Sequence, residues 1–130
     1  MEIDDRLLEG LLRKAGESPR LRMNYDLRNS PEDDSQRMLN ALLPGTQLPI
    51  HRHCKTSETV VILRGRMREI FYDDDGSVID SFLLSPNGDC MGLNIPRGQW
   101  HTVEVLEPSV ILESKDGAYE PISESDILNI

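Results

Sequence analysis

The chain has 130 residues, 38% of them hydrophobic, with 14 lysines and arginines against 23 aspartates and glutamates. This length predicts a single domain that can bury a real core without disulfides to hold it together. The net charge of −9 argues against nucleic acid or an anionic membrane as the main partner, although a local basic patch is compatible with it.

The two cysteines, Cys54 and Cys90, form neither a CxxC pair nor a disulfide framework. The first residues, MEIDDRLLEG, lack the basic and apolar regions of a secretory signal. No apolar run approaches the roughly 18 residues that a membrane span needs. We therefore expect a soluble cytoplasmic protein.

The segment DDRLLEGLLRKAG, residues 4–16, predicts a short N-terminal helix. Its four leucines have helical spacing, acidic residues precede them, and Arg13 and Lys14 follow, an order that suits the helix dipole. We expect this helix to end at Gly16 and to pack on the rest of the domain or on a partner subunit.

After the helix, the sequence predicts strands separated by turns. The predicted strand segments are LRMNYDL, QRMLNALLPG, ETVVILRGRMREIFY, SVIDSFLLS, CMGLNIP, HTVEVLE and SVILESKD. The third should break at Arg64-Gly65 into two paired strands, and DDDG, residues 73–76, should form a hairpin turn. Turn clusters about every 8 to 12 residues favour a mainly β sandwich or small barrel.

All three histidines lie in two short segments, GTQLPIHRHCKTSETVVILRG and IPRGQWHTVEV. Alternate residues of a strand share a face, so His51 and His53 should lie on one wall, and Glu58 could reach the same point if the chain folds back tightly. His101 would arrive from a distant strand, positioned by the PRGQW turn. Three neutral imidazoles and one carboxylate suit a divalent first-row metal. On these residues alone, surface or satisfied core histidines are an equally open interpretation.

The residues around the first two histidines resemble the first cupin motif at every defined position. Gly45 is followed by five residues, His51-x-His53, four residues, Glu58, six residues and Gly65. This spacing is specific, and it favours the metal-site interpretation over the alternative.

The second cupin motif is matched by PRGQWH, residues 96–101. It departs from the usual pattern in the spacing of its upstream glycine and in Val105, where an asparagine is common. The departures leave the His101 ligand intact. Together the two motifs cover about residues 45–105.

A longer resemblance covers about residues 18–121. The segments SPRLRMNYDL, QRMLNALLPGTQLPIHRH, ETVVILRGRM, FYDDDG, IPRGQWHTVEVLEP and KDGAYEP resemble the WbuC family of cupin-fold metalloproteins. The resemblance implies a double-stranded β-helix, a small jelly-roll barrel, with a metal at its open end. Some members occur in gene clusters for O-antigen or other surface polysaccharides. We expect one domain, with the helix in residues 1–17, the cupin barrel in 18–121 and a C-terminal tail in 122–130.

Several other residues are candidates for the site. Arg37 could bind a substrate carboxylate or phosphate, or form a surface ion pair. Trp100 could shield the site from water, or belong to the core. Glu113 and Lys115 share a strand face with Ile111, so they form an acid/base pair beside the metal if that face looks into the pocket; otherwise one of them is solvated at the strand end.

The cysteine beside the first motif is not a candidate ligand, because strand alternation points Cys54 away from the ion. The ligand set His51, His53, Glu58 and His101 predicts one divalent transition metal ion per chain, which could be manganese, iron, nickel, cobalt or zinc.

These features predict a metal-dependent enzyme acting on a small polar substrate such as a sugar or sugar nucleotide, in surface polysaccharide biosynthesis if the family resemblance extends that far. Isomerase, epimerase and dioxygenase chemistry all fit such a site, because one scaffold hosts many chemistries. The alternatives are a non-catalytic, metal-dependent binding or regulatory module, and a purely structural metal. Exposed sheet edges predict a homodimer.

Overall fold

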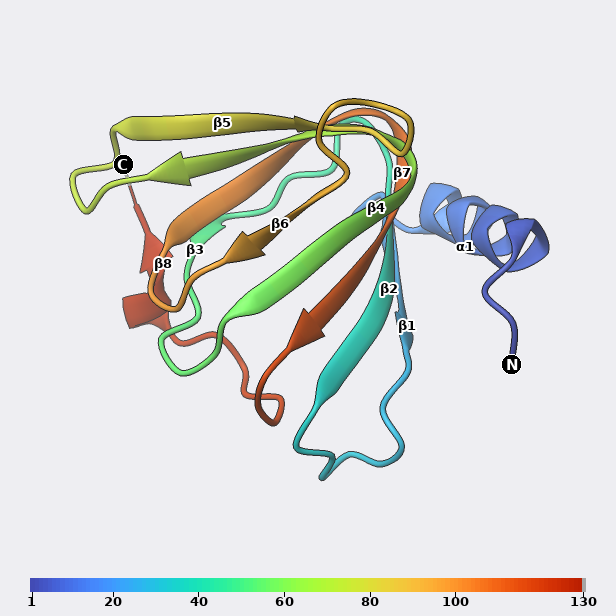
Figure 1. Ribbon diagram of the computed structural model, residues 1–130, viewed down its shortest axis with the longest axis horizontal. Helices are drawn as coiled ribbons and strands as arrows, with labels where there is room; N and C mark the ends of the chain where they lie inside the picture. Colours follow the sequence, from blue (N-terminus) through green and yellow to red (C-terminus); the bar gives the residue numbers. More distant parts are fainter. Residues whose placement is uncertain (130) are drawn as a thin grey trace.

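The computed structural model describes residues 1–129, in which an N-terminal helix precedes a mainly antiparallel β-structure (Figure 1). In chain order the elements are α1 (Asp5–Glu17), β1 (Arg22–Asp26), β2 (Gln36–Leu42), β3 (Ile50–His51), β4 (Glu58–Tyr72), β5 (Val78–Leu84), β6 (Gly92–Ile95), β7 (Trp100–Lys115), the 3-10 turn η1 (Glu124–Asp126) and β8 (Ile127–Leu128). This confirms the predicted fold class, a mainly β barrel with a short N-terminal helix.

Two long strands, β4 with 15 residues and β7 with 16, organise the barrel. They pair antiparallel along most of their length, from Tyr72 opposite Trp100 to Glu58 opposite Lys115. The first half of β4 and the second half of β7 form one sheet with β6, β2 and β1. Their other halves form a second sheet with β5, β3 and β8, and Figure 1 shows β4 and β7 curving from one sheet into the other.

The curve of β4 lies at Gly65, where the pairing with β7 shifts register. Gly65 has φ +93°, and a Cβ there would collide with the carbonyl of Pro108 and with Ser109. The Ser109 hydroxyl accepts a hydrogen bond from the Arg66 amide at 3.0 Å and donates one to the Glu107 carbonyl at 2.7 Å. The predicted break at this point is therefore a bend within one continuous strand, and the last two predicted strands are likewise one strand, β7.

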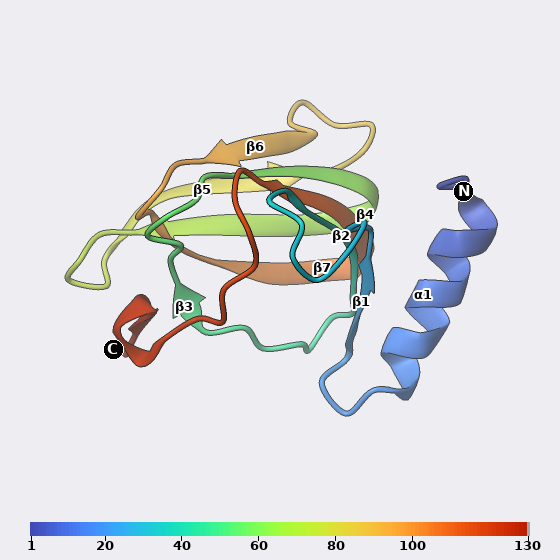
Figure 2. The ribbon, with the colours of Figure 1, turned by 90° about the horizontal axis from the view of Figure 1, so that it is seen from below.

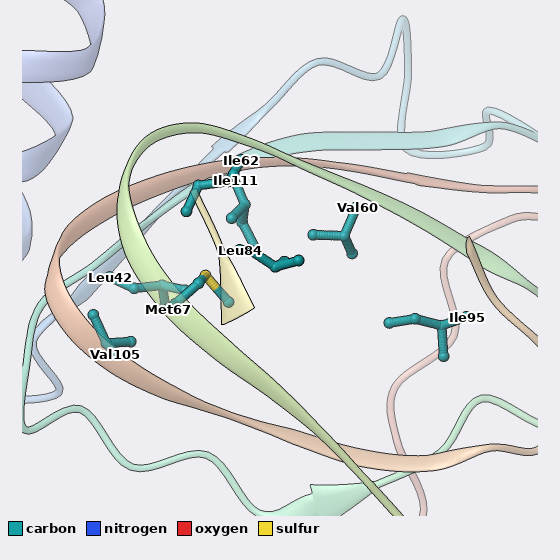
Figure 3. Close-up of a cluster of buried hydrophobic side chains, with 8 residues drawn as sticks. All are labelled: Leu42, Val60, Ile62, Met67, Leu84, Ile95, Val105 and Ile111. Carbon is teal, nitrogen blue, oxygen red and sulfur yellow. The ribbon is translucent and has the colours of Figure 1, made fainter. Parts of the chain in front are cut away.

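The main core fills the space between the two sheets, and Figure 3 shows its side chains converging from both. Its buried members are Leu42, Val60, Ile62, Met67, Leu84, Ile95, Val105 and Ile111. Strand alternation explains which residues are buried, because β4 buries Val60 and Ile62, two residues apart, and leaves Val61 between them exposed. The same inward face of β4 carries Glu58, two residues before Val60.

Helix α1 lies outside the barrel, against the sheet that contains β1 and β2 (Figure 2). Its Asp4 N-cap accepts a hydrogen bond from the Leu7 amide at 3.0 Å. Its buried face packs on outward-facing residues of β2 and β7; the cluster contains Leu8, Leu11, Ala15, Leu39, Ala41 and Val110. The helix ends at Glu17 with Ser18 as its C-cap, so Gly16 lies inside the last turn and does not end it, contrary to the prediction.

The C-terminal segment is also part of the fold. Residues 122–130 were expected to form a tail, but Ile127 and Leu128 form β8 and pair with β3. This short strand covers the edge of β3 that β7 leaves open. Of the residues described, none belongs to a helix long and apolar enough to cross a membrane.

We predict that Gly65→Ala lowers the free energy of unfolding by about 2 to 3 kcal/mol, because alanine is strained at positive φ and its methyl group meets backbone. The measurement is chemical denaturation. The control is Gly10→Ala in α1, where nothing lies within 4 Å of the added Cβ and about 1 kcal/mol of stabilisation is expected. Equal effects of the two substitutions would contradict this account of the bend.

Candidate metal centre

The three histidines come together as predicted. One ring nitrogen from each of His51, His53 and His101 lies within 4.8 Å of the others. The pairing of β3 with β7 places His51 directly opposite His101. His53 lies just beyond β3, and its carbonyl accepts a hydrogen bond from the Gly98 amide at 2.9 Å. Gly98 has the positive φ, +83°, expected for the turn that delivers His101.

Backbone carbonyls orient two of the rings. Nδ1 of His51 lies 2.9 Å from the Pro49 carbonyl, and Nδ1 of His101 lies 2.9 Å from the Gln99 carbonyl. A carbonyl can only accept, so in both rings Nδ1 carries the proton and Nε2 keeps a free lone pair. This is how proteins commonly fix the tautomer of a metal-ligating histidine.

Glu58 completes the cluster from the facing sheet. Its Oε2 lies 3.4 Å from Nε2 of His53 and 3.7 Å from Nε2 of His101. β3 and the first half of β4 belong to different sheets, so the chain does not fold back tightly between them, and Glu58 reaches the histidines across the barrel interior instead. The residue is 5% exposed, and its Oε2 has no hydrogen-bond partner in the described part of the chain.

The electrostatics of the cluster match the needs of a cation. Burial lowers the pKa of His51 to about 4 and that of His53 to about 3, and it also lowers the pKa of His101. The imidazoles are therefore neutral near pH 7, the form that binds metal. Burial raises the pKa of Glu58, because an unpaired carboxylate is costly inside a protein. A divalent transition metal fits this donor set, since it would take up the free lone pairs and the unpartnered oxygen.

Glu113 and Lys115 lie on the inner face of β7, which was the condition for their role as an acid/base pair. Ile111, on the same face, is in the core. In the register of β4 with β7, Lys115 stands opposite Glu58, and Glu113 stands opposite Val60. Burial, followed by the charge of Glu58, raises the pKa of Glu113 to about 7.

A third buried acid, Glu69, was not among the predicted site residues. It is 2% exposed and lies on β4 two residues from the core residue Met67 and opposite Val103. Burial, then the charges of Glu58 and Glu113, raises its pKa well above the usual value for a glutamate. Period-two counting from Met67 would have placed it inside the barrel.

A cavity of about 240 Å³ opens beside the cluster. His53 lines it, together with Gln36, Arg52, Lys55 and Lys115 and part of the C-terminal segment. Most of these side chains are polar or charged, so the cavity suits a small polar molecule better than an apolar one.

Neither Arg37 nor Trp100 is among the described residues that form the cluster or line the cavity. Arg37 forms the ion pair that was one of its two predicted roles, with Nη2 2.9 Å from Asp33 Oδ2, and it is not among the described residues that line the cavity. Trp100 is 7% exposed and donates to Asp74 at 2.9 Å. The guanidinium of Arg52, which does line the cavity, lies 4.3 Å from the Trp100 ring centroid. Trp100 therefore supports a cavity wall from behind.

Cys54 is exposed and lies outside the histidine cluster, as strand alternation predicted. Its thiol donates to Asp126 Oδ1 at 3.1 Å, and Arg52 Nε donates to the same oxygen at 3.1 Å. The Arg52 amide also donates to the Asp126 carbonyl at 3.1 Å. Asp126 thus ties the C-terminal segment to the chain between His51 and His53, along the cavity that both segments line.

Comparison with known proteins places the chain in a family. Residues 3–84 match the family described as Domain of unknown function (DUF6016). The chain belongs to this family. A comparison with curated protein sequences gives no match. The predicted membership of the WbuC family is therefore not confirmed.

Solved structures show the fold more widely. The protein TT1209 from Thermus thermophilus is 24% identical with a TM-score of 0.66, over 92% of this chain and 100% of that one. The capsular polysaccharide assembling protein CapF from Staphylococcus aureus is 20% identical with a TM-score of 0.65, over 93% of this chain and 31% of that one. An oxalate oxidase in complex with the substrate analogue glycolate is 18% identical with a TM-score of 0.67, over 92% and 64%.

These neighbours have the cupin fold, and at such identities they show the fold alone. This member of the DUF6016 family therefore has the cupin fold. It spans about a third of the length of CapF, and its histidine cluster is one that could hold a metal.

We predict that Asp126→Ala speeds hydrogen exchange at the amides of Arg52 and β8 by about two- to fivefold, the range that a surface ion pair contributes. The side-chain contacts to Arg52 and Cys54 are lost, whereas the strand pairing remains. Exchange followed by mass spectrometry checks this. Asp34→Ala, which removes an exposed acid elsewhere, should leave these amides unchanged. Unaltered exchange in Asp126→Ala would contradict the role of Asp126.

Proposed function

We propose that the protein binds one divalent transition metal ion per chain through His51, His53, Glu58 and His101. The observation that carries the proposal is the buried Oε2 of Glu58, which has no hydrogen-bond partner among residues 1–129 and faces two imidazole Nε2 atoms at 3.4 and 3.7 Å. The donor set is compatible with manganese, iron, nickel, cobalt or zinc.

We further propose that the protein is a metal-dependent enzyme acting on a small polar substrate, such as a sugar or sugar nucleotide. When bound, the ion would supply a Lewis acid that polarises a carbonyl or hydroxyl of the substrate. The chain itself would hold the substrate in the polar cavity beside His53. Glu113, with a pKa of about 7, is suited to take or give a proton near neutral pH. Such a site suits isomerase, epimerase or dioxygenase chemistry.

A non-catalytic, metal-dependent binding or regulatory module is the second candidate. A cavity lined only by apolar residues and arginine would favour this candidate, because such residues can bind a ligand but do not transfer protons. The guanidinium of Arg52, held over the Trp100 ring, is a feature of this kind. Glu113, on the inner face of β7, favours the enzyme instead, because it could transfer a proton beside the cluster.

We propose a role in cytoplasmic steps of surface polysaccharide biosynthesis. Two likenesses support it: the WbuC-like segments over about residues 18–121, and the fold likeness to CapF, a capsular polysaccharide assembling protein. The structure of a polysaccharide precursor, with its hydroxyl and carbonyl groups, is compatible with the polar cavity.

We predict near one equivalent of metal in the protein purified without added metal or chelator. His53→Ala should reduce bound metal to near background, because it removes one ligand and exposes Glu58 to water. Cys54→Ser is the matched control: it alters the neighbouring residue, which lies outside the cluster, and should leave the metal content unchanged. Elemental analysis measures both.

Unchanged stoichiometry in His53→Ala, or metal loss in Cys54→Ser, would overturn the assignment of ligands. The identity of the metal directs the assay: iron calls for measurement of oxygen consumption, and zinc, manganese or nickel for sugar isomerase and epimerase assays. A metal-free protein with the histidines intact would favour the binding module.

We also propose a homodimer. In the part of the chain that the structure describes, strand β5 pairs with β4 alone, and it exposes Val78, Ile79 and Leu83. An apolar sheet edge of this kind is normally covered. Light scattering of the purified protein should give twice the 14.8 kDa chain mass, and the mass of a single chain would refute the proposal.

A further inference from the structure

Three cationic side chains line the cavity, and two of them are neutralised. Arg52 Nε lies 3.1 Å from Asp126 Oδ1, and Lys55 Nζ lies 3.3 Å from Glu120 Oε2. Within residues 1–129, Lys115 takes part in no ion pair. It is therefore the lining cation whose charge remains available to a bound molecule.

The position of Lys115 is set by two strand pairings. On β7 it stands directly opposite Glu58 of β4 on one side and Gln36 of β2 on the other. Side chains opposite one another in adjacent strands lie on the same face of the sheet. Lys115 thus belongs to the inner face that carries Glu58, and it lines the cavity together with His53.

The acids nearest to Lys115 are engaged elsewhere. The Glu58 carboxylate is directed at His53 and His101, at 3.4 and 3.7 Å. The next residue, Asp116, accepts hydrogen bonds from the amide and hydroxyl of Ser57 at 2.9 and 3.1 Å. Glu113, two residues away on the same face, and Glu58 both interact with the charge of Lys115, but no carboxylate of residues 1–129 lies within 4.0 Å of its ammonium group.

With a divalent metal ion bound, the net charge of the site would favour an anionic substrate. The three imidazoles are neutral ligands and Glu58 supplies one negative charge, so a divalent ion would leave the cluster positive. Lys115 adds a second positive charge on the same side of the cavity. An isolated pair of like charges in a partly buried site is unfavourable unless an anion joins them.

We infer that the substrate carries a carboxylate or phosphate group and that Lys115 binds it, while another oxygen of the substrate faces the histidine cluster. The inference rests on the proposed metal site and narrows its substrate class to anionic polar molecules, such as hydroxy acids, sugar acids or sugar phosphates. Lys115 is then a specificity-determining residue, and Glu113 remains for proton transfer.

The test is titration calorimetry with three small probes. Glycolate offers a hydroxyl for the cluster and a carboxylate for Lys115, whereas glycolamide has the same shape without the charge. Inorganic phosphate represents the other anion. Whichever of the two anions binds more tightly shows whether the negative group of the substrate is a carboxylate or a phosphate. The protein is used as purified, and its metal content is measured in each sample.

We expect glycolate or phosphate to bind the wild type at least tenfold more tightly than glycolamide. Lys115→Gln should weaken binding of that anion by about ten- to a hundredfold, the loss expected for a hydrogen bond to a charged group. It should leave metal content and glycolamide binding unchanged. Lys14→Gln removes the same charge from a lysine on α1, outside the barrel, and should bind the anion like the wild type.

Lys115→Arg keeps the positive charge and should retain anion binding, which separates loss of charge from misfolding. Equal anion binding by wild type and Lys115→Gln, or no preference of the wild type for either anion over glycolamide, would overturn the inference. The metal content of each sample tests the proposed metal site separately from the role of Lys115. If a metal-free protein bound the anion and Lys115→Gln abolished this binding, the proposed metal site would be wrong and the anion site would remain supported.

Discussion

The antiparallel pairing of β4 with β7 is the constraint on which the rest of the structure depends. It continues through a bend at Gly65, where any side chain would be strained against the Pro108 backbone, so the same two strands enter both sheets. Because the sheets share these strands, their inner faces are held opposite each other. One inner face supplies Glu58 and the other supplies His51 and His101. The candidate metal centre is thus a product of the bend as much as of its ligands.

The interior near the cluster is unusual in the number of acids that it buries. Glu58, Glu69 and Glu113 all point inward from β4 and β7, and burial raises the pKa of each. In a barrel selected only for stability, apolar side chains would serve better at these positions. The acids instead surround neutral imidazoles with free lone pairs, an arrangement that a cation would stabilise. The buried acids that cost folding free energy therefore lie where the metal is proposed to bind.

Much of the fold and the ligand cluster could be predicted from sequence, because both depend on local periodicity. The alternation of His51 and His53 and the turn at Gly98 place the three histidines correctly. Interactions between distant segments could not be read in this way. Nothing near Glu58 indicates that it crosses from the facing sheet, and nothing near Ile127 and Leu128 indicates that they pair with β3. Arg37 shows the same limit, since its partner Asp33 lies in a turn whose shape the residues did not specify.

The long pairing of β4 and β7 also has a consequence for the order of folding. Tyr72 and Trp100 are the paired residues closest along the chain, and Glu58 and Lys115 are the farthest apart. Loop closure costs least for the closest pair, so zipping of the two strands should begin near Tyr72 and finish at Glu58. The carboxylate of the cluster would then join the histidines only in the last step. An ion bound by all four ligands would act on the completed barrel, slowing its unfolding without hastening its formation.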